Sequence, residues 1–202
     1  MGKSQNSAAE FTLSEQEIQR LIDSTTTFRN RVLIRTLYLT GIRREELCNL
    51  DVADVQLDRK RLTIRHGKGD KSRIVPLTDS LVNDLRALIG RRSTGPVFVS
   101  QRGGRLNART VNYIVEDAGK GAGLTNPNPE RKTINPHLLR HSFARHYLHN
   151  GGRMHLLSQI LGHADVSITH SVYGTASAEE VQEEYGKVMG DEQDTSGAIP
   201  AC

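Results

Sequence analysis

The segment 135–144 reads NPHLLRHSFA and decides how the rest of the chain is interpreted. Its Asn-Pro pair predicts a helix start, because proline at the first helical position gives up an N–H that would have no partner there. A Gly-Gly pair at 151–152 ends the predicted helix. His137 and Arg140 are three positions apart, so both project from one helical face. An imidazole and a guanidinium on one face are suited to joint contact with a phosphate.

Three other segments carry related chemistry. They are TGIRREEL at 40–47, GKGDKSR at 67–73 and LGH at 161–163, and Tyr173 lies ten residues after the histidine of the last one. In the first segment Glu46 follows Arg43 by one helical turn, so its carboxylate can hold the guanidinium. In the second, a glycine-containing turn between two strands lets Lys68 reach into a DNA groove. Taken alone, the first pattern is usually a surface ion pair and the second an ordinary turn.

The order, types and spacing of these residues resemble the tyrosine recombinase (phage integrase) family, which cuts and rejoins DNA through a phosphotyrosine bond. The segment 40–47 is similar to the family's T-G-(L/I)-R-x-x-E-L box, and 137–144 is similar to its H-x-L-R-H-(S/T)-F-A box. Two departures are a glutamate at position 45, where many relatives carry serine, and a tyrosine one residue further from the LGH box than usual. The resemblance implies catalytic roles for Arg43, Lys68, His137, Arg140, His163 and Tyr173, support of Arg43 by Glu46, and DNA contacts by Lys71 and Arg73.

Some alternatives remain open from the residues alone. Lys71 competes with Lys68 for the role of general acid, and Tyr185 competes with Tyr173 for that of nucleophile. His137 and His141 have the i, i+4 spacing of a zinc pair, but no nearby cysteine completes a site. The chain has no G-x-x-x-x-G-K-[ST] loop, so neither ATP nor any other cofactor is expected, and no metal is expected.

Charge is unevenly distributed along the chain. There are 27 Lys and Arg against 23 Asp and Glu, but seven of the acids and only one base, Lys187, lie beyond Tyr173. Residues 1–173 therefore hold 26 bases and 16 acids, a net charge of +10. A basic body suits a polyanionic partner such as double-stranded DNA, although a solvated surface would have the same composition.

The patterning predicts a mainly α chain with a small antiparallel β-sheet (α+β), which the resemblance identifies as the DNA breaking-rejoining catalytic-domain fold. We expect strands at 61–66 and 72–77, a third short strand at Val97–Ser100, and helices over most of the remainder. The expected organisation is a disordered lead at 1–12, a catalytic domain at 13–175, a C-terminal tail helix at 176–190 and a disordered tail at 191–202. The two cysteines predict no disulfide framework, and no apolar run suggests a signal or a membrane span, so a cytoplasmic, DNA-associated protein is expected.

The tail helix has an apolar stripe of Val181, Tyr185 and Val188. Such a stripe needs a groove in which to be buried. The family resemblance implies a homo-oligomer that forms a tetramer on two DNA sites and is weak or monomeric without DNA, so we expect the stripe to dock on a neighbouring protomer. The alternative is that the helix folds back over the enzyme's own DNA face. Two rival functions remain, a type IB topoisomerase-like nicking-closing enzyme and a non-catalytic DNA-binding module of the same fold.

Overall fold

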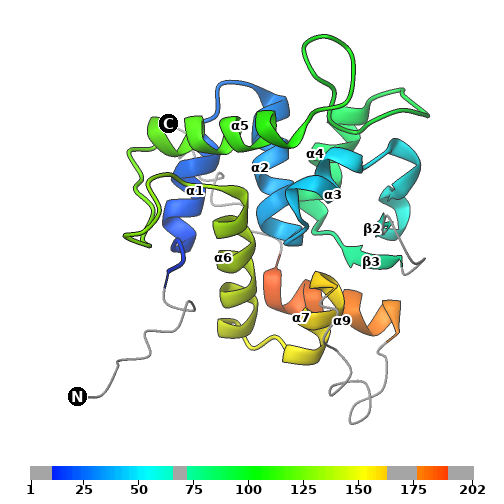
Figure 1. Ribbon diagram of the computed structural model, residues 1–202. Coiled ribbons are helices and arrows are strands. Elements are labelled where there is room, and N and C mark those ends of the chain that lie inside the picture. Colours follow the sequence, from blue (N-terminus) through cyan, green and yellow to red (C-terminus); the bar gives the residue numbers. More distant parts are fainter. Residues whose placement is uncertain (1–10, 66–71, 163–176, 191–202) are drawn as a thin grey trace, which may run out of the picture.

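A computed structural model describes residues 11–65, 72–162 and 177–190 (Figure 1), and the structural statements below concern these residues. The helices are α1 (Glu15–Asp23), α2 (Phe28–Thr40), α3 (Arg44–Asn49), α4 (Asp79–Ile89), α5 (Ala108–Gly121), α6 (Pro136–His149), α7 (Met154–Leu161) and α9 (Ala178–Met189). The strands are β1 (Val55–Gln56), β2 (Arg61–Ile64) and β3 (Arg73–Pro76), and Val52–Asp54 and Leu57–Arg59 form short 3-10 helices. The predicted α+β class is confirmed. None of the described helices is long and apolar enough to cross a bilayer.

Helix α2 lies at the centre of the molecule and packs against α1, α4 and α6. It begins after Thr27, whose side chain accepts a hydrogen bond from the Asn30 N–H, and it ends at Gly41 in the left-handed conformation with φ of 61°. A Cβ at Gly41 would lie 2.5 Å from Cδ1 of Phe143 on α6. The left-handed backbone conformation and the close approach to Phe143 therefore both require glycine at position 41. This contact places the start of α3 beside α6.

The predicted antiparallel pairing of strands β2 and β3 is confirmed, and the predicted turn between them lies outside the described residues. Strands β2 and β3 are antiparallel and pair Leu62 with Val75 and Ile64 with Arg73, and β1 pairs with the other edge of β2. Leu62 and Ile64 are buried, whereas Arg61 and Thr63 are partly exposed, which is the alternation expected of a half-buried strand.

The third strand expected at Val97–Ser100 is wrong. Val99 makes only an isolated bridge to Arg105, because the chain reverses at Gly103 and the Ser100 N–H bonds the Gly104 carbonyl at 2.7 Å. Val97 and Phe98 are apolar and buried, so the sequence looks like a strand although the described residues form only isolated bridges here. The third strand is instead β1, which is too short to leave a periodic signal.

Helix α9 lies where a helix was expected, beside α7 at the end of the molecule opposite α5 (Figure 1). Its apolar stripe is buried on its own chain, which corrects the expectation that this stripe occupies a neighbour's groove. The Tyr185 side chain is fully buried, and its hydroxyl donates to the Leu39 carbonyl at 2.7 Å. The neighbouring residue Glu184 accepts hydrogen bonds from the Tyr147 hydroxyl and from the Arg153 backbone N–H, at 2.9 and 2.7 Å. The groove that the stripe requires is therefore present within the chain.

Candidate active site

A cleft of about 830 Å³ lies between the start of α3, the first half of α6 and the loop that joins α5 to α6. Three of the residues expected to be catalytic, Arg43, His137 and Arg140, line it together. Arg43 and His137 are 94 positions apart in the sequence, so the fold and not the local sequence brings them together. No described residue of α9 lines this cleft, so the alternative in which α9 covers it is not what the described structure shows.

Arg43 is the residue that precedes α3. Its backbone N–H donates to Glu46 Oε2 at 2.7 Å, and its Nη1 donates to Glu46 Oε1 at 3.2 Å. The Arg43 side chain is still 44% exposed. The guanidinium is thus held from one side by a carboxylate while its other donors remain open to the cleft, which is the arrangement expected of an arginine that binds an incoming anion.

Arg140 is held more deeply. It is 9% exposed, Nη2 donates to the Leu161 carbonyl at 2.9 Å, and Nη1 donates to the Gly41 carbonyl. Burial, followed by the charges of Arg43 and Arg73, lowers the pKa of Arg140 to about 10, so it stays protonated at neutral pH. The positive charges of Arg43 and Arg140 are therefore held near each other. An anion bound between them would offset their repulsion.

His137 lies in the first turn of α6. Its Nε2 is 2.8 Å from Nε2 of His141, so one ring donates and the other accepts. Burial, followed by the charges of His141, Arg140 and Arg131, lowers the pKa of His137, which favours the neutral ring at pH 7. Among the described residues, no group of three or more His, Cys, Asp or Glu side chains forms around this pair.

Glu46 has a second and closer partner. Arg73 Nη1 and Nη2 donate to its two oxygens at 2.8 and 2.7 Å, and Arg73 Nε donates to the Ile160 carbonyl at 2.7 Å. Although burial raises the pKa of Glu46, the hydrogen bonds and charge of Arg73, with those of Arg43, lower it to about 2. The Arg73 side chain is 8% exposed. The expected DNA contact by Arg73 is therefore corrected, because this side chain points into the protein.

Four of the expected site residues, Lys68, Lys71, His163 and Tyr173, lie outside the described residues, and their roles remain predictions. The structure does bear on the rival nucleophile Tyr185. Its hydroxyl is fully buried and bonded to a carbonyl, and burial raises its pKa. A phenol in this position cannot reach a phosphate in the cleft.

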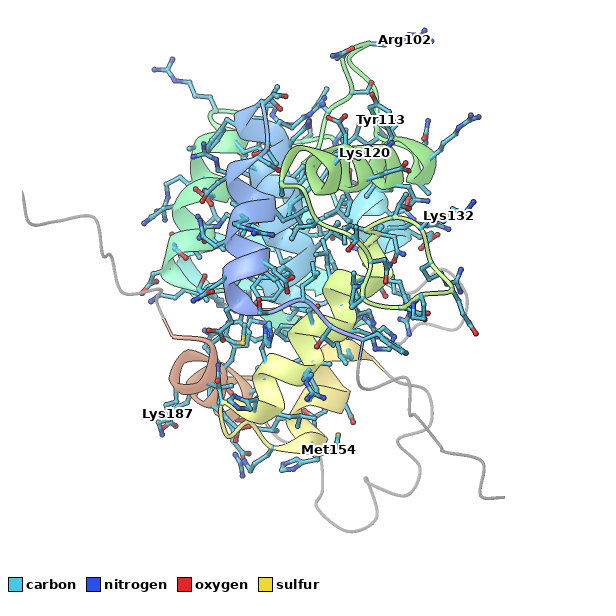
Figure 2. All side chains as sticks on the ribbon, turned by 90° about the vertical axis from the view of Figure 1, so that its left-hand side faces the viewer. Arg102, Tyr113, Lys120, Lys132, Met154 and Lys187 are labelled. Atoms are coloured by element: carbon cyan, nitrogen blue, oxygen red, sulfur yellow. The ribbon has the colours of Figure 1, made fainter. Side chains whose placement is uncertain are left out.

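The loop before α6 contributes cleft residues that the sequence analysis did not single out, namely Asn126, Asn128 and Arg131. Asn126 Oδ1 accepts from the Asn128 N–H at 3.0 Å, and Asn126 Nδ2 donates to the Thr133 carbonyl at 2.7 Å. These bonds shape the loop, in which Arg131 lines the cleft and its exposed neighbour Lys132 does not (Figure 2). The Asn-x-Asn pattern is a recognisable turn signal, but it does not reveal which way the following arginine faces.

Comparison with known proteins places the chain in a family. Residues 12–180 match the phage integrase family, and the chain belongs to that family. This class of protein is the one predicted from the boxes at 40–47 and 137–144.

Two tyrosine recombinases are similar to most of this chain. Tyrosine recombinase XerA of Pyrococcus horikoshii is 33% identical over 177 residues, which cover 85% of this chain and 59% of the relative. Tyrosine recombinase XerD of Mycobacterium tuberculosis is 36% identical over 156 residues, covering 73% and 48%. The chain thus spans about half to three fifths of the length of these relatives.

Solved structures agree with this assignment. A crystal structure of XerA recombinase matches with a TM-score of 0.70 and 35% identity, covering 93% of this chain and 66% of that one. The pre-cleavage complex of XerH site-specific recombinase bound to difH substrate matches with a TM-score of 0.64 and 27% identity, covering 79% and 49%.

Proposed function

We propose that this chain is a site-specific DNA recombinase that cleaves and rejoins strands through a covalent 3′-phosphotyrosine. The observation that carries the proposal is the convergence of Arg43, His137 and Arg140 on one cleft. Two guanidiniums and an imidazole suit the charge of a phosphodiester in its transition state. The family membership and the relatives named tyrosine recombinases support the same reaction.

In the proposed reaction Tyr173 Oη attacks a phosphorus of the DNA backbone. The new O–P bond forms as the bond to the 5′ oxygen breaks, and Lys68 gives the departing oxygen its proton. Arg43 and Arg140 stabilise the negative charge on the nonbridging oxygens, with His137 and His163 as further hydrogen-bond partners. A neutral His137, as its lowered pKa favours, is also able to accept a proton from the tyrosine.

A 5′-hydroxyl from another strand then attacks the phosphotyrosine and releases Tyr173. One phosphodiester replaces another, so the two steps need no ATP. We propose double-stranded DNA as the partner, with assembly into a tetramer on two sites and action in the compartment that holds the DNA. The structure of XerH site-specific recombinase bound to difH substrate supports DNA as the partner by analogy.

The test is covalent trapping on a pool of nicked duplexes with randomised sequence, where loss of a short 5′-hydroxyl fragment prevents religation. We expect a protein–DNA complex that survives denaturation and selects particular sequences. The recovered duplex is then placed at two sites on plasmids. Exchange between the sites supports recombination, whereas relaxation without exchange supports the topoisomerase alternative. Sequence-selective binding without any adduct supports the non-catalytic module.

A further inference from the structure

We propose that Arg73 is a positioning residue for the cleavage step, which holds Glu46 and the end of α7 so that Arg43 stays available to the phosphate. The inference rests on the proposed function and adds a residue whose expected role was a surface DNA contact. It is carried by the hydrogen bonds of one buried side chain that connects three separate elements.

Arg73 lies at the start of β3, and all three of its guanidinium nitrogens are engaged within the chain. Two bind the carboxylate of Glu46 on α3 side by side, and the third binds the carbonyl of Ile160 on α7. A planar fork can make such parallel bonds, and a lysine cannot. The side chain therefore connects β3 with α3 and α7. In the sequence, β3 follows Lys68, α3 follows Arg43, and α7 precedes His163.

The end of α7 is fixed by two arginines. Arg73 binds the Ile160 carbonyl, and Arg140 binds the next one, that of Leu161. These are C-terminal carbonyls of the helix, which have no partner within it. Gly162 then turns with φ of 64°, and a Cβ there would lie 2.8 Å from Arg73 Cδ. The guanidinium thus packs directly against the turn from which the chain continues to His163.

Arg73 also determines how strongly Glu46 holds Arg43. With Arg73 in place, the carboxylate makes its shorter side-chain bonds to Arg73, at 2.7 and 2.8 Å, and only a 3.2 Å bond to Arg43. Without Arg73, the same partly buried carboxylate would have one guanidinium as its partner. It would then draw Arg43 toward itself and neutralise a charge that the phosphate needs.

A matched control exists on α2, outside the lining of the cleft. Arg35 is another partly buried arginine, 15% exposed, and its Nη1 lies 3.1 Å from Asp84 Oδ2 while Nη2 donates to Ser80 at 3.0 Å. Neither Arg35 nor Asp84 lines the cleft. Arg35→Gln therefore breaks a comparable buried ion pair away from the site, and it reports the effect of destabilisation alone.

The experiment compares Arg73→Gln, Arg35→Gln and the double variant Glu46→Gln/Arg73→Gln in the full chain. Single-turnover cleavage is measured on the duplex selected by covalent trapping, together with DNA affinity and thermal unfolding. We expect Arg73→Gln to cleave about 10²-fold more slowly than Arg35→Gln, because small displacements of catalytic groups have effects of this size. DNA affinity should change little, since the buried guanidinium contacts no phosphate.

The double variant separates positioning from a general loss of stability. If Glu46 competes for Arg43 once Arg73 is gone, removing its charge should recover part of the lost rate even though stability falls further. Should Arg73→Gln fail to fold, Arg73→Lys keeps a cation beside Glu46, and it should still lose rate because it cannot reach both Glu46 and Ile160. Equal cleavage by Arg73→Gln and Arg35→Gln, or a double variant slower than Arg73→Gln, would overturn the proposal.

A second measurement makes failure of the proposed function distinguishable. If the unmodified chain forms no adduct, the recombinase proposal fails. The positioning claim is then judged by hydrogen exchange, which is expected to rise at Arg43 and Gly162 in Arg73→Gln and to stay unchanged there in Arg35→Gln. Unchanged exchange at both positions in Arg73→Gln would overturn the positioning claim as well.

Discussion

Two adjacent arginines at the start of α3 have different surroundings. Arg43 is tied to Glu46, and its charge acts on Arg140, whereas Arg44 binds the exposed carboxylate of Glu45 through Nε at 2.6 Å. An exposed pair of the second kind contributes little to stability. Arg43 and Arg44 are neighbours in the sequence, but they bind different carboxylates, so we expect them to have different roles.

The first prediction concerns these two arginines. Arg43→Ala should slow covalent cleavage about 10²–10³-fold, the usual effect of removing one preorganised donor to a transition state. Arg44→Ala is the matched control and should change the rate by less than about tenfold. Single-turnover rates on one duplex give the comparison, and equal losses would show that Arg43 has no special role.

The second prediction concerns pH. The pKa of His137 is lowered in the folded chain, so the unfolded state binds more protons as pH falls below its ordinary value of about 6.5. The free energy of unfolding should therefore decrease from pH 7 toward pH 5. His146, whose pKa burial also lowers, contributes in the same direction. Urea unfolding of His137→Gln should show a shallower decrease than the unmodified chain, and an identical or steeper decrease would contradict this assignment.

At the scale of elements, local signals predicted helix ends well. The proline start of α6 lies where it was predicted, and the capping box of Ser14 and Glu17 starts α1 through a signal of the same local kind. These devices depend on residues three or four positions apart, so a linear pattern contains them.

The direction in which Arg73 faces could not be predicted in this way. Its partners Glu46 and Ile160 are 27 and 87 positions away, and both face β3 only after α3 and α7 have packed. The same limit applies to Arg131, whose place on the cleft depends on the path of a loop. Long-range packing, and not any local propensity, decides both cases.

The third prediction tests the cis packing of α9. Tyr185→Phe removes the hydroxyl that binds the buried Leu39 carbonyl, so we expect a loss of about 1–2 kcal/mol in the free energy of unfolding. Covalent attachment to DNA should persist. Tyr113→Phe, at a side chain 65% exposed, is the control and should change stability by less than about 0.5 kcal/mol. A Tyr185→Phe chain of unaltered stability would indicate that α9 is not docked on its own body.

At the scale of the whole molecule, the cleft combines α3, α6 and the loop between α5 and α6, and its charged lining residues are four arginines and one glutamate. The nearby carboxylates are already engaged, Glu45 by Arg44 and Glu46 by Arg73 and Arg43. Sequence motifs identified the lining residues with predicted catalytic roles because their spacing is characteristic. The cleft itself required the fold, since its walls come from segments nearly a hundred positions apart.

The fourth prediction follows from this balance of charge. Arginines and histidines can supply the positive field that a metal would otherwise provide, so cleavage should persist in excess EDTA and without nucleotide. Adduct formation is measured with and without the chelator. Loss of activity that Mg²⁺ or Zn²⁺ restores would contradict the prediction and would favour a metal role for His137 and His141.

The most direct test of the proposed reaction is to identify the residue that becomes covalently attached to DNA. Adduct trapped on the selected nicked duplex is digested with protease and nuclease, and the modified peptide is sequenced by mass spectrometry. We predict a nucleotide attached to Tyr173 through a 3′-phosphate, and we expect Tyr173→Phe to bind the same duplex without forming an adduct. An adduct on any other residue, or one that persists in Tyr173→Phe, would contradict the account.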